Sequence, residues 1–237
     1  MLKRFIGIIV AISLIFVLSA CNVVKGNGNV TDEVFELSDF SEIEFDGVGD
    51  VFIETGEVES VVIRTDENLQ ERMKAEVRGD TLYIGQQDGN NLMNPSEITF
   101  LITVTDLDSV VISGAGAVTI DGIEAETLAL ELNGATDTTL TDIDVDSLSI
   151  EISGAGGANA SGQAQSLTVD ISGVGEFSGF DLETDTAEIN ISGAGSAEVN
   201  VNDTLTGSIN GVGDLSYRGN PSVDVEQNGL GDVSAED

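Results

Sequence analysis

The chain has 237 residues, with 43 acidic and 8 basic side chains, no His and one Cys, so its formal net charge is −35. Without His there is no Ser-His-Asp triad and no His-ligated zinc site, and one Cys cannot form an internal disulfide. Eight basic residues are too few for a nucleic-acid surface, which depends on neutralising phosphates. Hydrophobic residues nevertheless make up 41% of the chain, so we expect a folded protein rather than a disordered acidic one.

Residues 1–20 have the pattern of a secretory signal peptide. Lys3 and Arg4 precede an apolar run over 5–18, which is shorter than the ~20 residues of a membrane-spanning helix. The next residues, Leu18-Ser19-Ala20-Cys21, resemble a bacterial lipoprotein box, which implies cleavage before Cys21 and a lipid on its sulfur. We therefore expect an exported protein that is lipid-anchored in the bacterial cell envelope, with residues 21–30 as a flexible tether. The alternative is an ordinary secretory signal with an incidental Cys.

A glycine-centred repeat occupies the second half of the chain. Seven units of the type Ser/Asn-Gly-x-Gly recur every 18–20 residues, the second one having Thr in place of the second Gly. They begin at Ser113, Asn133, Ser153, Ser172, Ser192, Asn210 and Asn228. A fixed period of this size is typical of a solenoid.

Residues before each glycine alternate with the period of a β-strand. The position two residues before it is apolar in six of the seven units, whereas the position three before it is polar in all but one. A second short strand follows each glycine pair, with small or apolar residues such as Val118, Thr138 and Ala158 in one inward column. Coils of about 18–20 residues that turn at glycine predict an all-β fold, a single-stranded parallel β-helix or β-solenoid.

Residues 31–237 are expected to form one β-helix domain, with 111–237 as its regular repeats. Residues 31–110 are less regular and are interpreted as leading coils that cap the core. Within them we expect an early coil at 41–53, strands at 60–65, 81–85 and 98–104, a short helix at 68–75 and a polar loop at 86–95. The polar, acidic end of the chain is interpreted as protection of the last strand edge.

The chain resembles a known bacterial family. A lipoprotein signal, the Phe45-Asp46-Gly47-Val48-Gly49-Asp50-Val51 segment, the Leu69–Lys74 stretch and the Ser-Gly-Ala-Gly coils together resemble the head GIN domain of the auto-transporter adhesins, from about Phe40 onward. The resemblance implies a right-handed β-helix and an exported location. It transfers no functional residues, because the activity of the family is uncharacterised.

Acidic residues repeat at two positions of the coil. Glu131, Glu151 and Asp170 fall at one position of three successive coils, and Asp214 and Asp232 fall at another. Stacked carboxylates repel one another, and Ca²⁺ prefers such oxygen ligands, so these five residues are weak candidates for Ca²⁺ binding. The alternative is a solvated acidic face, and no catalytic residue or further cofactor is predicted.

The leading hypothesis for function is a binding or structural module, similar to an adhesin, that presents a rigid acidic surface and is not an enzyme. The expected partners are the membrane, through the lipid, and a surface glycan or an envelope protein. Two alternatives are a carbohydrate-active enzyme, of the polysaccharide lyase or glycoside hydrolase type, and an envelope stress or assembly factor that works through a protein partner. A cleft with convergent carboxylates and an Arg or Lys would favour the enzyme.

Overall fold

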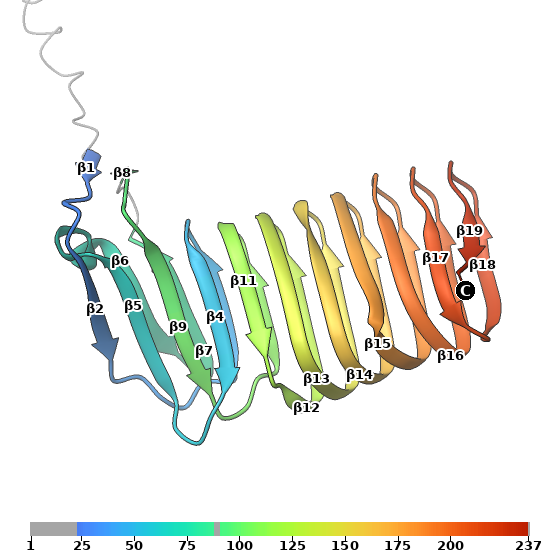
Figure 1. Cartoon of the computed structure of the whole chain (residues 1–237), viewed down its shortest axis with the longest axis horizontal. Helices are drawn as coiled ribbons and strands as arrows, with labels where there is room; N and C mark the ends of the chain where they lie inside the picture. Colours follow the sequence, from blue (N-terminus) through green and yellow to red (C-terminus); the bar gives the residue numbers. More distant parts are fainter. Residues whose placement is uncertain (1–22, 88–90, 237) are drawn as a thin grey trace, which may run out of the picture.

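The computed structural model describes residues 23–87 and 91–236, which form a rod of stacked β-coils (Figure 1). The regular half consists of β10 (Ser109–Ile112), β11 (Ala115–Asp121), β12 (Glu124–Leu132), β13 (Ala135–Ile152), β14 (Ala155–Ile171), β15 (Val174–Ile191), β16 (Ser196–Ile209), β17 (Leu215–Gly219), β18 (Ser222–Gln227) and β19 (Val233–Ala235). Neighbouring coils pair in parallel, so the predicted all-β parallel β-solenoid is confirmed.

Each coil has two main faces that meet at the glycine corner. Face A is the strand segment that precedes a corner, such as 147–152 of β13 before Gly154. Face B is the segment that follows a corner, such as 135–141 of β13 after Gly134. On face A, Glu131 of β12 pairs with Glu151 of β13, 20 residues later. The spacing of the repeats along the sequence therefore equals the sequence separation between paired residues of neighbouring coils.

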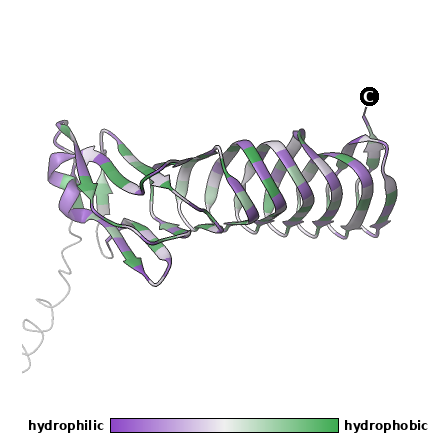
Figure 2. Cartoon of the chain, turned by 90° about the horizontal axis from the view of Figure 1, so that it is seen from below, coloured by the Kyte–Doolittle hydropathy of each residue, from purple (hydrophilic) through white to green (hydrophobic). Residues whose placement is uncertain are grey.

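The inward columns form one continuous apolar core. The residue two before the corner glycine is buried in the first six units: Ile112, Leu132, Ile152, Ile171, Ile191 and Ile209. In the last unit this residue is Gln227, which is exposed. In Figure 2 hydrophobic and hydrophilic residues alternate along the coils, as expected for strands with one buried face. Alternation therefore decides which side chains point inward, and stacking then buries them in columns.

Residues 30–104 form a cap at the blue end of the rod (Figure 1). Its elements are β2 (Val30–Phe35), β3 (Glu42–Asp46), β4 (Asp50–Thr55), β5 (Ser60–Asp66), η1 (Glu67–Arg72), β6 (Met73–Arg78), β7 (Thr81–Gln86) and β9 (Ile98–Val104). Strands β3 and β4 pair in parallel with β10 and β11, as the expected early coil requires. Beyond them β2, β5 and β6 pair antiparallel, which ends the solenoid pattern.

The short helix expected at 68–75 is wrong in type and in extent. A 3₁₀-helix covers Glu67–Arg72, and the chain then becomes strand β6 from Met73. Met73 and Leu69 are buried in the core, and β6 pairs along its whole length with β7. Pairing with β7 and burial of Met73 outweigh the helical propensity of this stretch, because propensity is only a weak local preference.

Residues 23–30 are held against the cap, in contrast to the flexible tether expected over 21–30. Strand β1 (Val23–Lys25) pairs in parallel with β8 (Asn91–Met93), inside the stretch expected to be a polar loop. The backbone N–H of Gly28 donates to Asp66, whose carboxylate also accepts from the backbone N–H of Ser96 at 2.7 Å and from its hydroxyl at 3.0 Å. Cys21 and the signal segment lie outside the described residues.

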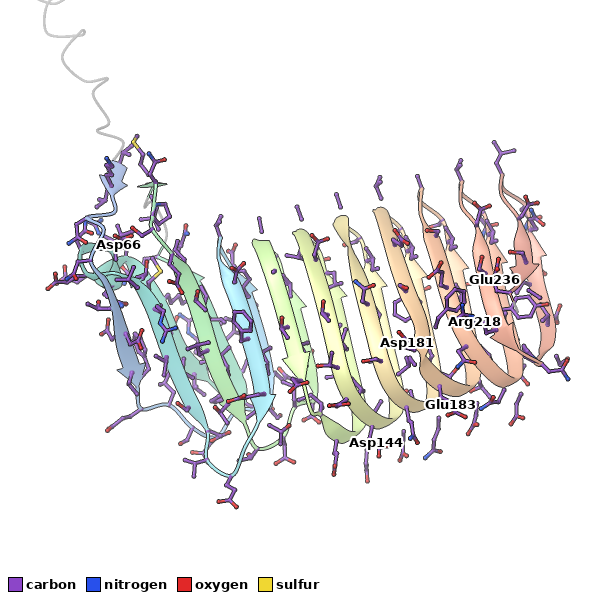
Figure 3. All side chains as sticks on the ribbon, in the orientation of Figure 1. Asp66, Asp144, Asp181, Glu183, Arg218 and Glu236 are labelled. Carbon is purple, nitrogen blue, oxygen red and sulfur yellow. The ribbon has the colours of Figure 1, made fainter. Side chains whose placement is uncertain are left out.

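The hydrogen bonds to Asp66 have an electrostatic consequence. The side chain is buried, and the backbone N–H of Ser96, more than any other group, lowers the pKa of this carboxyl below its usual range. Asp66 therefore stays ionised while it joins the N-terminal segment to the cap (Figure 3). Within 23–87 and 91–236, no helix is long and apolar enough to cross a membrane.

Candidate functional site

An exposed apolar ridge runs along the glycine corner of the rod. It consists of Val48, which follows Gly47 in the early coil, and of the residue that follows the first glycine in each of the seven units: Ala115, Ala135, Ala155, Val174, Ala194, Val212 and Leu230. Its larger members are strongly exposed, with Val174 at 65%, Val212 at 56% and Leu230 at 71%. All eight are apolar, although the chain is highly acidic, so the ridge is a surface feature that solubility alone does not explain.

Backbone stacking fixes the position of this ridge. The N–H of Val174 donates to the carbonyl of Gly154 at 3.0 Å, and that of Val212 donates to Gly193 at 2.9 Å. The same bond recurs from coil to coil along the corner. The ridge side chains therefore stand in a row on a hydrogen-bonded backbone.

Glycine is required at the corner because successive coils approach too closely for a Cβ. A Cβ on Gly173 would overlap the carbonyl oxygen of Gly154, and one on Gly193 would overlap that of Gly173. The backbone at these positions is not in the left-handed region, so close approach rather than φ demands glycine.

A groove of about 560 Å³ lies beside the ridge on face B. Its floor consists of Gly156, Gly175, Gly195 and Gly213. One side is the ridge, with Val174, Ala194 and Val212, and the other side carries Asp137, Glu176 and Asp214. The corner thus offers an apolar edge and a glycine floor that repeat at the coil spacing of about 4.8 Å. The acidic edge recurs only in every second coil, because Gly157 and Ser196 occupy the position between the acids.

The five residues expected as Ca²⁺ ligands lie on two different faces. Glu131, Glu151 and Asp170 stack in register on the outside of face A, as the sequence indicates. Asp214 and Asp232 lie on face B, beside the corner. In the part of the chain that the structure describes, no group of three or more acidic or Cys side chains is placed to hold a metal ion. Calcium binding stays a prediction.

Asp214 has a structural role that the sequence did not indicate. Its carboxylate accepts a hydrogen bond at 2.9 Å from the backbone N–H of Asp232 in the next coil. Asp50 does the same at the start of the rod, where it accepts from the N–H of Ala117 at 3.0 Å. Acids at this position therefore satisfy backbone donors between coils.

A second cavity, of about 550 Å³, lies in the cap beside β6 and β7. Lys74 and Arg78 each lie 5.3 Å from the centre of the Tyr83 ring, and both form ion pairs with Glu76 at 3.0 and 2.6 Å. The hydrogen bond from Lys74 is the largest of the effects that together lower the pKa of Glu76. This cavity, the cap cleft, combines acids with Lys and Arg, as the enzyme alternative requires. However, Lys74 and Arg78 are already paired with Glu76, and both lie over the ring of Tyr83, the tyrosine on which a bound sugar would stack.

Sequence reasoning missed both the ridge and the cap cleft. The ridge could have been found, because the residue after the first glycine of each unit is always Ala, Val or Leu. The cleft gave no signal, since Lys74, Arg78 and Tyr83 come together only through the pairing of β6 with β7.

The sequence of residues 39–221 matches the family described as "Putative auto-transporter adhesin, head GIN domain". The chain belongs to this family. The match includes most of the cap and six of the seven repeat units, so the resemblance noted from the sequence is confirmed. The family is described by adhesion and not by a catalysed reaction. No curated protein matches the chain.

Three solved structures of similar fold illustrate the likeness. A "putative adhesin" from Bacteroides fragilis NCTC 9343 superimposes with a TM-score of 0.87 at 20% identity, over 90% of this chain and 100% of that one. A second, from Parabacteroides distasonis ATCC 8503, has a TM-score of 0.70 at 22% identity over 90% and 100%. A "putative lipid binding protein" from the same strain has a TM-score of 0.66 at 23% identity over 91% and 100%. At these identities the likeness concerns the fold.

Proposed function

We propose that this head GIN protein is an adhesin-like binding module of the bacterial envelope and that it binds its partner along the apolar ridge and the adjoining groove. The observation that carries the proposal is the row of eight apolar residues on an acidic rod, of which seven are exposed and Ala115 is half-buried. Monomeric proteins rarely expose extended apolar surface without a use for it.

The rigidity of the corner supports a role in binding. Every ridge residue from Ala115 to Leu230 donates its backbone N–H to the preceding coil, so little backbone entropy is lost when a partner docks. A partner with a linear, repeating surface, such as an envelope glycan or an extended protein segment, would contact several coils at once. Such multivalent contact raises the overall affinity without a deep pocket.

The ridge is tested by replacing its three largest exposed side chains on the C-terminal coils with polar ones. The variant Val174→Thr/Val212→Thr/Leu230→Thr should lose at least about tenfold in binding to isolated envelope glycans or envelope proteins, measured with a soluble chain that begins at residue 22. The matched control is Val34→Thr/Val58→Thr, since these valines are 66% and 75% exposed away from the ridge. Equal binding by the ridge variant and the parent chain would refute this surface.

The proposal also includes a lipid anchor at Cys21. An anchored protein would stay with the membrane fraction after cell lysis, because two or more acyl chains hold a protein there almost irreversibly. Cys21→Ser should move the protein to the soluble fraction. If that variant stays in the membrane fraction, the anchor does not depend on Cys21.

A further inference from the structure

The two ends of the rod are closed in different ways. At the cap, β2, β5 and β6 run antiparallel, and η1 buries Leu69. At the other end the last coil consists of β18 and β19, which pair with β16 and β17 on one side only. Among the described residues no further strand covers them (Figure 1).

The open end leaves apolar side chains half-buried. Val223 is 40% exposed, whereas Leu205, its register partner one coil earlier, is fully buried. Val233 is likewise only partly buried, whereas its partner Leu215 is fully buried. One more strand on this end would complete the burial that every inner coil already has.

The last coil also has free backbone hydrogen-bonding groups. The N–H of Asn228, the residue after β18, donates to the carbonyl of Ile209, so the even-numbered residues of β18 face the preceding coil. Backbone groups alternate in direction along an extended strand. The N–H and C=O groups of Val223, Val225 and Gln227 therefore point away from the rod, as at any unpaired sheet edge.

Charge decides what kind of strand fits this edge. Asp224, Glu226, Asp232 and Glu236 are exposed on the last coil, and residues 219–236 contain no Lys or Arg (Glu236 is labelled in Figure 3). A second copy pairing through β18 would bring Asp224 and Glu226 against the same acids, which is unfavourable. A strand with alternating apolar and basic residues would extend the core and neutralise the acids.

We propose that the C-terminal edge of the rod, β18 with β19, accepts an added β-strand from a partner protein whose residues alternate between apolar and basic. Strand addition to an exposed edge is an established mode of peptide recognition, in which backbone bonds provide affinity and side chains provide specificity. The edge lies at the end of the rod opposite β1, which begins two residues after Cys21 in the sequence (Figure 1). An anchored rod therefore presents this edge away from its anchor. The inference concerns a surface separate from the groove and survives if the ridge proposal fails.

The test uses a synthetic peptide of alternating Val and Lys, titrated against the soluble chain by calorimetry or fluorescence anisotropy. A peptide of the same composition with its Lys and Val residues in separate blocks is the peptide control. The alternating peptide should bind at least about tenfold more tightly than the block peptide. Equal affinities would overturn the proposal, because attraction to the net charge would then explain all of the binding.

Two variants locate the site. Val225→Pro removes an N–H that points away from the rod and is compatible with an edge strand, so the protein should stay folded but lose at least about tenfold in affinity. The variant Asp224→Lys/Glu226→Lys should also lose its affinity for the alternating peptide, because its charges would repel the Lys residues. The matched control, Glu131→Lys/Glu151→Lys, changes the net charge equally in mid-rod and should retain at least half of the parent affinity.

Three results would overturn the proposal. They are unchanged binding by a folded Val225→Pro protein, an equal loss in the mid-rod control, and no binding of the alternating peptide to the parent chain. A fourth overturning result would come from sedimentation. If the parent chain forms dimers and Val225→Pro abolishes them, the occupant of the edge is a second copy of the chain. Circular dichroism of each variant establishes that it is folded.

Discussion

Thr138 offers a sharp test of how the core is built. Its side chain is fully buried on face B, in register with Val118 and Ala158 of the adjacent coils, and its hydroxyl has no hydrogen-bond partner. Thr138→Val replaces that hydroxyl with a methyl group of nearly the same shape. The substitution should stabilise the fold, because an unsatisfied buried polar group costs about 1–3 kcal/mol.

The magnitude follows from the environment of the site. Since both register neighbours are apolar, the new methyl group meets apolar surface and gains up to about 0.8 kcal/mol from burial. We expect a net stabilisation of about 1–2 kcal/mol. For a domain of this size each kcal/mol raises the thermal midpoint by about 2–4 °C, so scanning calorimetry can resolve the change.

Thr184 is the matched control. It is also buried, but its hydroxyl donates to the carbonyl of Asn200 at 2.8 Å. Thr184→Val should therefore destabilise the fold by about 1–2 kcal/mol, since this hydrogen bond to the Asn200 carbonyl is lost. If both substitutions shift the thermal midpoint in the same direction, hydrogen-bond satisfaction does not govern these two positions and the reasoning is refuted.

Three further predictions concern the corner, the cap and the acidic face. Gly173→Ala should lower the thermal midpoint strongly, because the added Cβ overlaps the preceding coil. Gly122 has a φ of +69 and open space around it, so Gly122→Ala should cost only about 1–2 kcal/mol of backbone strain. Equal losses of stability in the two variants would contradict close approach as the cause. The pKa of Asp66 is lower in the folded than in the unfolded protein. The stability that its ionised carboxylate provides is therefore complete above the ordinary Asp pKa of 3.8 and is lost as the pH falls through the folded pKa. An NMR titration of the Ser96 amide should give a midpoint below 3.8, and a midpoint above 3.8 would disprove the assignment. Millimolar Ca²⁺ should raise the thermal midpoint more than NaCl of equal ionic strength does, and Glu151→Gln should reduce the difference; no excess over NaCl would exclude binding to the acidic columns.

Local signals made the solenoid half predictable. Two features predict it: the alternation of apolar and polar residues around Ile152 and Ile171, and the 18–20-residue spacing of the corner glycines. Both reflect contacts between adjacent coils, so the same pattern recurs in every repeat. Gly173 needs no knowledge of distant residues, because its closest neighbour, Gly154, is the same position one coil earlier. The stacking of Glu131, Glu151 and Asp170 could be read from the sequence for the same reason.

The cap was less predictable because its contacts occur only once. Met73 leaves the expected helix to pair with Gln86, and Asp66 joins Gly28 to Ser96 across 38 and 30 residues of sequence. No periodicity connects such residues. Their partners are selected by burial of the remaining apolar surface and by satisfaction of backbone groups at the end of the rod.

The sequence by itself determined the coil, its inward columns, its glycine corners and its excess of acid, since these depend on interactions that recur at a fixed spacing. Only the tertiary structure decided how the two ends differ. Closure at the cap depends on antiparallel pairing between strands that share no repeat, whereas the C-terminal edge ends at β18 and β19 with the free sides of Val223 and Val225. The −35 net charge of the chain does not distinguish the ends, but the acids on the last coil, placed around an open edge, give that end a preference among partners.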